Sequence, residues 1–277
     1  MRIAVLGTGM VGRTLAAKLD GLGHEVVIGT RDPAVTNART EPGGFGTPPF
    51  PEWQAGRPQV RLMSFAEAGA FASLVMNATS GSVAMAVLVA AGEAALAGKV
   101  LIDVSNPLDF SRGMPPTLDP VNTDSLGEQI QRAFPAVRVV KALNTMNCQV
   151  MVEPGRVPGE HNVFLCGNDE SAKQAAAELI GSFGWPAGSL IDLGEISSAR
   201  GTEMLMPSGC GSWEPSGTPT STSTSPTPDR KLPSALEAPA GRQSPAPDPR
   251  GTRWTPKTCA RCSSRSRTPT AATRRPP

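Results

Sequence analysis

Residues 1–31 decide the fold, and they read MRIAVLGTGMVGRTLAAKLDGLGHEVVIGTR. The first six residues are a short apolar run that leads without a break into the pattern Gly7-x-Gly9-x-x-Gly12. An Ala- and Leu-rich segment after Gly12 predicts a helix, and Glu25–Gly29 predicts a second strand. Such a glycine pattern between a strand and a helix is typical of dinucleotide-binding sites. We therefore expect this segment to bind a dinucleotide rather than to be a purely structural turn.

Each glycine has a physical role in this interpretation. Gly7 permits the tight turn, Gly9 lets the backbone approach a pyrophosphate, and Gly12 lets helix and strand pack closely. The helix N-terminus offers free N–H groups and partial positive charge to the phosphates.

The end of the second strand indicates which dinucleotide is bound. NAD sites usually have an acidic residue here, whereas NADP sites bring an arginine to the 2′-phosphate. This strand ends in Thr30 and Arg31, a hydroxyl and a guanidinium that suit a phosphate. Asp32 follows and could instead cap the next turn. The residues favour NADP over NAD, the alternative being that Arg31 is a solvated loop charge.

Composition divides the chain in two. Residues 1–205 contain 15 Lys and Arg against 20 Asp and Glu, with ordinary apolar content. Residues 206–277 contain 11 against 4, hold 14 of the 28 prolines, and lack Val, Ile and Phe. We expect one α/β domain over 1–205 and a disordered Pro/Ser/Thr/Arg-rich tail over 206–277, because such a segment cannot bury enough apolar surface to order itself. The tail has no interleaved aromatic residues, so its basic charge does not indicate a nucleic-acid partner.

Location and redox state follow from weaker signals. The N-terminus has no signal-peptide pattern, and the longest apolar run, Val83–Ala91, is too short to span a bilayer. Cys148 and Cys166 are predicted to be reduced thiols, and Cys259 and Cys262 are not predicted to bind a metal. We expect a cytoplasmic protein with neither a membrane partner nor a metal site.

Strand and helix patterns alternate along residues 1–205. The patterns predict further strands over 59–63, 73–77, 99–104, 138–143, 162–166 and 190–193, and helices over 65–71, 81–96, 124–134 (capped by Asp124) and 169–183. The Gly- and Pro-rich residues 41–57 are predicted to be a surface excursion near the cofactor. The alternation favours an α/β fold with a doubly wound, mostly parallel sheet of the Rossmann type, in which ligands bind at the carboxyl ends of the strands.

Polar clusters follow three of these strands. Helix capping would explain each one singly, but together they would surround the nicotinamide and its ribose. The expected coenzyme-binding residues are therefore Gly7, Thr8, Gly9, Met10, Val11, Gly12, Thr30, Arg31, Ala78, Thr79, Ser105, Asn106 and Asn144.

No residue stands out as catalytic. The chain has no tyrosine, which excludes a Tyr-x-x-x-Lys short-chain dehydrogenase, and its two histidines, His24 and His161, are predicted to be structural. Lys141 is predicted to be a charge at a strand end. Hydride transfer between two ring cofactors needs close, dry placement more than proton chemistry, and would leave such a pattern.

These residues carry a family resemblance. The stretches GTGMVG (7–12), GTRD (29–32), NAT (77–79), IDVSNP (102–107) and VVKALNT (139–145) resemble the coenzyme-F420-dependent NADP oxidoreductase family over Met1 to about Met204. The resemblance implies a Rossmann domain that binds NADP, with Thr8–Val11 as phosphate loop and Thr30–Arg31 at the 2′-phosphate. A family lysine beyond that pair has no counterpart here. Ferric reductases share the Lys-Ala-hydrophobic-Asn stretch, so the resemblance identifies the cofactor more firmly than the acceptor.

The chain departs from the family after Arg200–Met204. Relatives continue with an apolar segment similar to LPLWLRLWGALG and then HFNI, whereas residues 207–214 read PSGCGSWE. Reading the codons of residues 207–223 from the third base of each permits LWLRLLGALGHPHFNI. We hypothesise a single-base insertion or deletion near Leu205–Met206, the rival being a genuine tail or partner-binding linker. By resemblance, the lost helix would have formed one wall of the deazaflavin pocket.

The expected function is hydride transfer between NADP(H) and a small-molecule redox acceptor, coenzyme F420 or a flavin, by a chain that could form a homodimer. A non-catalytic NADP-binding sensor or redox-partner protein is the alternative. Imine reductases and 3-hydroxyacid dehydrogenases share the glycine loop, but they need a large C-terminal helical domain that the sequence lacks.

Overall fold

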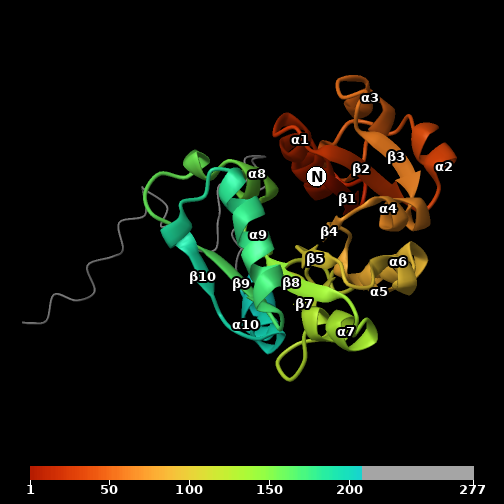
Figure 1. The fold of residues 1–277 in the computed structure, drawn as a ribbon. Helices are drawn as coiled ribbons and strands as arrows, with labels where there is room; N and C mark the ends of the chain where they lie inside the picture. The colour runs from red at the N-terminus through yellow and green to blue at the C-terminus, as the bar shows by residue number, and fades with distance from the viewer. Residues whose placement is uncertain (208–277) are drawn as a thin grey trace, which may run out of the picture. The chain divides into compact units, whose positions relative to one another are not determined.

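A computed structural model describes residues 1–207, all of them within one compact unit, and the predicted tail lies outside this range except for Met206 and Pro207. An eight-stranded sheet forms the centre, in the order β10-β9-β8-β5-β4-β1-β2-β3 (Figure 1). Its strands are β1 (Arg2–Leu6), β2 (Glu25–Thr30), β3 (Arg61–Ser64), β4 (Leu74–Asn77), β5 (Val100–Asp103), β8 (Arg138–Ala142), β9 (Val163–Gly167) and β10 (Leu190–Asp192). A separate hairpin pairs β6 (Leu108–Asp109) with β7 (Thr117–Leu118).

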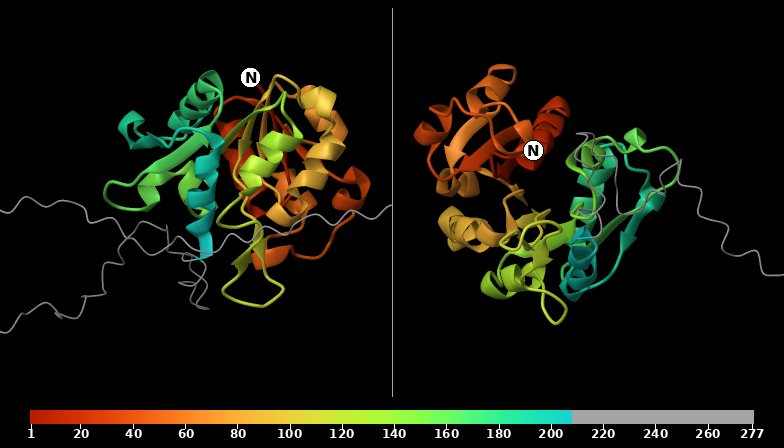
Figure 2. Two further views of the ribbon diagram at one scale, coloured as in Figure 1. Left: turned by 90° about the horizontal axis from the view of Figure 1, so that it is seen from below. Right: turned by 180° about the vertical axis from the view of Figure 1, so that it is seen from behind.

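Helices cover both faces of the sheet, as Figures 1 and 2 show. One face packs against α1 (Met10–Gly21), α3 (Phe50–Ala55), α8 (Cys148–Val152) and α9 (Glu170–Ser182). The other packs against α4 (Phe65–Phe71), α5 (Gly81–Ala91), α6 (Glu93–Leu96), α7 (Leu126–Ala133) and α10 (Ala199–Met204). Short connecting helices are α2 (Pro33–Asn37), η1 (Gly44–Gly46), η2 (Pro154–Arg156), η3 (Ala187–Ser189) and η4 (Ile196–Ser198). Within residues 1–207, no helix is both long enough and apolar enough to cross a membrane.

This double cover explains the continuous apolar character of the strands. In β1, Ile3 and Val5 enter the core beneath α1, whereas Ala4 and Leu6 enter the core beneath α4 and α5. A parallel sheet with helices on both faces buries both sets of side chains, so its strands show no alternation of polar and apolar residues. The predicted α/β fold of the Rossmann type, with a mostly parallel sheet, is confirmed.

The last two strands depart from the parallel arrangement. β9 pairs antiparallel with β8, and β10 is parallel to β9, so both run against the other six strands. The connection after β8 contains α8, a helix of five residues. Because β9 is antiparallel to β8, it starts at the edge of the sheet where β8 ended.

Two local predictions differ from the structure. The predicted helix over 81–96 is divided into α5 and α6 at Gly92, whose φ of +93° interrupts the helix. The cap of α7 is Ser125, whose hydroxyl accepts from the Glu128 N–H at 3.2 Å. Asp124 instead binds Arg132 through two hydrogen bonds of 2.9 and 2.7 Å.

The excursion over residues 41–57 is tied to α1. Arg13 donates from Nε to the Thr8 carbonyl at 2.7 Å and from Nη1 to the Pro48 carbonyl at 2.5 Å. Its guanidinium carbon also lies 5.3 Å from the ring centre of buried Phe50. Arg13 thus joins this segment to the turn that precedes α1.

Candidate functional site

The turn between β1 and α1 requires glycine at two positions. Gly7 has a φ of +119°, and a Cβ there would lie 2.7 Å from the Ala78 carbonyl oxygen. A Cβ on Gly12 would lie 2.1 Å from the Gly7 carbonyl oxygen. Gly9 differs, because a Cβ there would meet nothing within 4 Å. The fold therefore requires glycine at positions 7 and 12, whereas the missing side chain at Gly9 leaves open space over the turn.

The N-terminus of α1 faces that open space with its backbone donors. Gly9 is the N-cap residue, and it provides no side-chain hydrogen bond to the 12-residue helix. Thr8 precedes it, and half-buried Met10 and Val11 form the first turn. The first N–H groups of a helix have no partner within the helix, and together with its dipole they form an anion-binding site. This geometry fits a pyrophosphate.

At the end of β2, the two expected 2′-phosphate residues occupy different environments. Thr30 is buried, and its Oγ1 lies 2.9 Å from Oγ1 of Thr36. Arg31 is exposed and makes no hydrogen bond or ion pair with another residue of the described range. Asp32 caps α2, accepting from the N–H groups of Ala34 at 2.8 Å and Val35 at 3.0 Å. The strand end therefore presents a guanidinium to solvent.

The ends of β4 and β5 are joined by a buried polar network. Asn77 and Asp103 are register partners, and Asn77 Nδ2 donates to Asp103 Oδ1 at 2.9 Å. The Thr79 hydroxyl donates to Asn77 Oδ1 at 2.7 Å, and the Ser105 hydroxyl donates to Asp103 Oδ1 at 2.6 Å. Both hydroxyl protons are thus used inside the protein, so Thr79 and Ser105 can offer only lone pairs to a ligand.

Lys141 continues this row on β8 as the register partner of Asp103. Its Nζ lies 2.8 Å from Asp103 Oδ2, 2.8 Å from Glu203 Oε1 and 2.6 Å from the Ser105 carbonyl oxygen. Burial disfavours the ammonium, but the two carboxylates outweigh burial and raise the pKa of Lys141 above its ordinary value. Lys141 is the fourth of the five residues of β8, in agreement with the expected charge near a strand end, but the sequence did not indicate that it is wholly buried with two acidic partners.

Asn106 and Asn144 form a pair of amides next to this row. Asn144 Nδ2 donates to Asn106 Oδ1 at 2.9 Å, and Asn106 Nδ2 donates to the Asn144 carbonyl at 2.8 Å. Asn144 Oδ1 is buried and has no hydrogen-bond partner among the described residues. Leu143, the preceding residue, has a φ of +63°, which is costly for a side chain branched beyond Cβ. Strain beside an unsatisfied amide is typical of a ligand site.

The strand order brings these groups to one edge. β8, β5, β4, β1 and β2 are consecutive neighbours and mutually parallel, so their carboxyl ends lie along the same edge of the sheet. The chain runs from β1 outward to β3, then returns with β4 on the other side of β1. Such a switch point is where doubly wound sheets bind ligands. Ala78, whose N–H donates to the Leu6 carbonyl at 2.9 Å, lies at this point beside Gly7.

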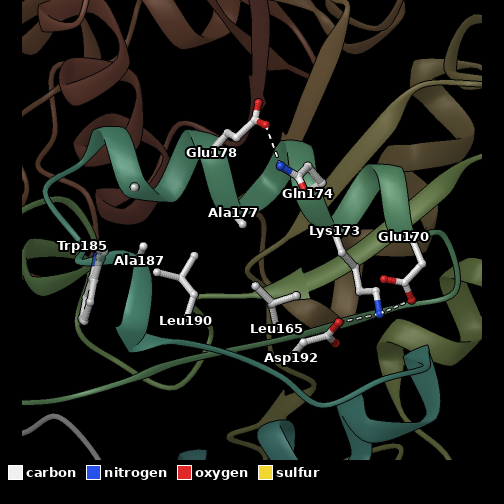
Figure 3. Close-up of a pocket in the computed structure, with 11 residues that line it drawn as sticks. Leu165, Glu170, Lys173, Gln174, Ala177, Glu178, Trp185, Ala187, Leu190 and Asp192 are labelled. Carbon is white, nitrogen blue, oxygen red and sulfur yellow. Dashed lines mark hydrogen bonds and ion pairs between the residues drawn. The ribbon is translucent and has the colours of Figure 1, made fainter.

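Figure 3 shows a pocket elsewhere, between α9 and the strands β9 and β10. Its volume is about 460 Å³. Its ionic groups satisfy one another, since Lys173 Nζ lies 2.7 Å from both Glu170 Oε1 and Asp192 Oδ2. Strands β8, β5 and β4 separate it from the glycine turn. It is therefore distinct from the candidate coenzyme site.

Comparison with known proteins decides the family. Residues 2–107 match the family model described as NADP oxidoreductase, coenzyme F420-dependent. A solved structure from Arthrobacter sp. FB24, which carries the provisional name F420-dependent NADP-reductase, is 59% identical to this chain. The match covers 75% of this chain and 90% of that one, with a TM-score of 0.71. The chain belongs to the F420-dependent NADP oxidoreductase family.

Two curated relatives resemble this chain over only part of their own length. The metalloreductase STEAP3 of Rattus norvegicus is 30% identical over 205 residues, 74% of this chain and 36% of that protein. The F420-dependent NADP reductase of Methanocaldococcus jannaschii is 28% identical over 113 residues, 40% of this chain and 49% of that protein. The chain thus spans half or less of the length of these curated relatives.

Three residues of this buried polar network were not predicted as site residues from the sequence. Asn77 and Asp103 end buried strands, the same position that drew attention to Thr79 and Ser105, so the sequence carried a signal for them. Glu203 carried none, because its role depends on α10 docking next to Lys141. Its Oε2 accepts from the Leu126 N–H at 2.9 Å at the start of α7.

Proposed function

We propose that this chain binds NADP(H) across the β1–α1 turn and the end of β2. In this proposal the pyrophosphate binds the N–H groups over Gly7–Gly12, and the Arg31 guanidinium binds the 2′-phosphate. The supporting observation is an open, uncapped helix N-terminus next to an exposed arginine that has no partner within residues 1–207. Thr30 would stabilise the turn after β2 from inside the protein, since its hydroxyl is hydrogen-bonded to that of Thr36.

The nicotinamide half would bind where β4, β5 and β8 end. Ala78, Thr79, Ser105, Asn106 and Asn144 lie along this edge. Thr79 and Ser105 offer lone pairs, and Asn144 Oδ1 is an unused acceptor, so this edge suits a ligand rich in donors. The ribose hydroxyls and the carboxamide NH₂ of the nicotinamide half are such donors.

The proposed reaction is hydride exchange with a deazaflavin of the F420 type or a related flavin. Bound NADPH supplies the hydride, and the protein's contribution is to hold two rings in close, dry contact. Lys141 is held by two carboxylates, and both nitrogens of His161 lie within 3.1 Å of backbone carbonyls. These groups are engaged structurally, which favours a reaction that depends on placement rather than on proton transfer. The names of the Arthrobacter and Methanocaldococcus relatives favour F420 as acceptor.

The test measures the rate at which the full chain oxidises NADPH, monitored by absorbance, with F420, FMN or a ferric chelate as the acceptor. We expect turnover with F420 to exceed turnover with the other two. Tight NADPH binding without turnover by any acceptor would favour the sensor alternative, and preferred reduction of the ferric chelate would contradict the deazaflavin assignment.

Arg31→Ala and Arg61→Ala provide a matched pair of variants for this assay. Both remove one exposed arginine, but Arg61 lies at the amino end of β3, where it pairs with Glu25 at 3.0 Å. At limiting NADPH, Arg31→Ala should lower the rate, and Arg61→Ala should leave it unchanged. Equal effects would point to general electrostatics and contradict the role given to Arg31.

A further inference from the structure

A row of buried polar groups extends beyond the proposed coenzyme site to the last described helix. Asn77, Asp103 and Lys141 lie side by side on β4, β5 and β8, as their register shows. Glu203 on α10 completes the row, with Oε1 at 2.8 Å from Lys141 Nζ. All four residues are at most 2% exposed, so the row is shielded from water.

The charges in this row are arranged to be tolerated together. Two carboxylates face one ammonium, and Glu203 also accepts from the N–H groups of Leu126 at 2.9 Å and Gly127 at 3.1 Å. These donors belong to the first turn of α7, where the helix dipole favours negative charge. A buried ion pair adds little net stability compared with apolar packing, so stability alone does not account for the row.

The row ends at groups that would face the coenzyme. Lys141 Nζ donates to the Ser105 carbonyl at 2.6 Å, which fixes the peptide between Ser105 and Asn106. Asp103 Oδ1 accepts from the Ser105 hydroxyl at 2.6 Å and from Asn77, which in turn accepts from Thr79. A shift of the ammonium would therefore move two backbone segments and reorient two hydroxyls at the strand ends.

We propose that Glu203 is a positioning residue for the nicotinamide half of the coenzyme. It holds the Lys141 ammonium against Asp103 and the Ser105 carbonyl, and so sets the positions of Ser105, Asn106 and Thr79. The inference rests on the proposed function. With this role for Glu203, α10 belongs to the coenzyme site, although α10 lies far from the glycine motif of residues 7–12 in the sequence.

The test compares two ligands by titration calorimetry on the full chain. NADPH contains the nicotinamide and its ribose, whereas adenosine 2′-phosphate 5′-diphosphate contains only the adenosine half and the pyrophosphate. Glu203→Gln keeps the size of the side chain but removes its charge. We expect this variant to bind NADPH about tenfold more weakly, the equivalent of one charge-assisted hydrogen bond. Its affinity for the fragment should stay within about twofold of wild type.

Arg200→Gln is the matched control. Arg200 also ties α10 to α7, with Nε donating to Glu128 Oε2 at 2.8 Å, but it does not contact Lys141. This variant should leave the ratio of the two affinities unchanged. The same ratio change in both variants would show that docking of α10, not Glu203, is responsible.

Two results with Glu203→Gln would overturn the proposal: both affinities unchanged, or both lowered by the same factor. If this variant does not fold, Glu203→Asp decides, since it keeps the carboxylate but retracts it by one methylene. A partial change in the ratio supports the role of Glu203, and no change contradicts it. Failure of the wild-type chain to bind NADPH would instead contradict the proposed function itself.

Discussion

At the scale of single residues, burial decides the chemistry of the two described cysteines. Burial raises the pKa of Cys166 to about 12, a shift that the nearby Lys141 ammonium only partly opposes. Burial also raises the pKa of Cys148, whose Sγ accepts a hydrogen bond from the Thr14 hydroxyl at 3.7 Å. Since the thiolate is the reactive form, both side chains should be inert in the folded protein.

Alkylation with iodoacetamide near neutral pH, read out by peptide mass spectrometry, checks this expectation. Cys148 and Cys166 should stay unmodified in the native chain and react fully after denaturation. Rapid labelling of Cys166 in the folded protein would contradict its burial.

Single-residue environments were predictable from sequence where they depend on near neighbours. Asp32 as a cap, the positive φ of Gly7 and the close approach of Gly12 to Gly7 are local features of the turns, and the structure confirms them. The burial of Lys141 was not predictable, because it depends on a carboxylate from α10. Arg31 as the 2′-phosphate ligand stays a prediction.

At the scale of elements, the β1–α1 unit separates folding from binding. Gly12→Ala would place a methyl 2.1 Å from the Gly7 carbonyl and should destabilise the fold by about 1–3 kcal/mol. Gly9→Ala meets no atom within 4 Å, so its melting temperature should match wild type. The added methyl would occupy the space for the pyrophosphate and should weaken NADPH binding about tenfold or more.

Gly21→Ala, at the end of α1, is the control for these variants. A Cβ there also meets nothing within 4 Å, and alanine favours helix, so stability and NADPH affinity should hold or rise slightly. Thermal melts and calorimetry on the three variants give both readouts. Normal NADPH affinity in Gly9→Ala would place the pyrophosphate elsewhere.

The start of α7 gives a pH-dependent prediction. Hydrogen bonding from Arg132 lowers the pKa of Asp124 from 3.8 to about 2. The folded state therefore holds the carboxylate more strongly than the unfolded chain, and the pair stabilises above about pH 4, an effect lost as pH falls toward about 2. Because the pair is partly exposed, Asp124→Asn should cost only about 0.5–1 kcal/mol near neutral pH.

Chemical unfolding of wild type and Asp124→Asn at several pH values measures this difference. The gap should be constant near neutral pH and close as pH falls below about 4. A gap that persists at about pH 2 would assign the effect to packing rather than to the Asp124 charge.

Element types were more predictable than element directions. The parallel strands and their order of appearance follow from apolar runs separated by helical patterns, and the structure confirms them. The reversal of β9 was not predictable, because nothing in the strand's own residues distinguishes the two directions. The hairpin of β6 and β7 contains two residues per strand, too few for a periodic signal.

At the scale of the whole molecule, the described structure ends just after α10 is anchored by Glu203 and Arg200. The hypothesised change of reading frame near Leu205–Met206 therefore follows the last contacts on which the coenzyme site depends, and the predicted tail lies outside the described residues. Resequencing of genomic DNA and messenger tests it. A frame that continues into HFNI after one inserted or deleted base supports the hypothesis, and an intact frame removes it.

Assembly is a second question at this scale. The edge strand β10 and the residue after it expose Ile191 and Leu193, each 37% exposed, and α10 exposes Met204. The expected homodimer stays a prediction, which sedimentation of the full chain can test. A monomer at all concentrations would contradict it.

The central claim is that Arg31 and the β1–α1 turn select NADP(H), and calorimetry of the full chain with NADPH and NADH tests it most directly. We predict clearly tighter binding of NADPH by wild type, and a loss of about 1.5–3 kcal/mol for NADPH alone in Arg31→Ala. Equal affinity for the two coenzymes, or unchanged NADPH affinity in the variant, would contradict the account.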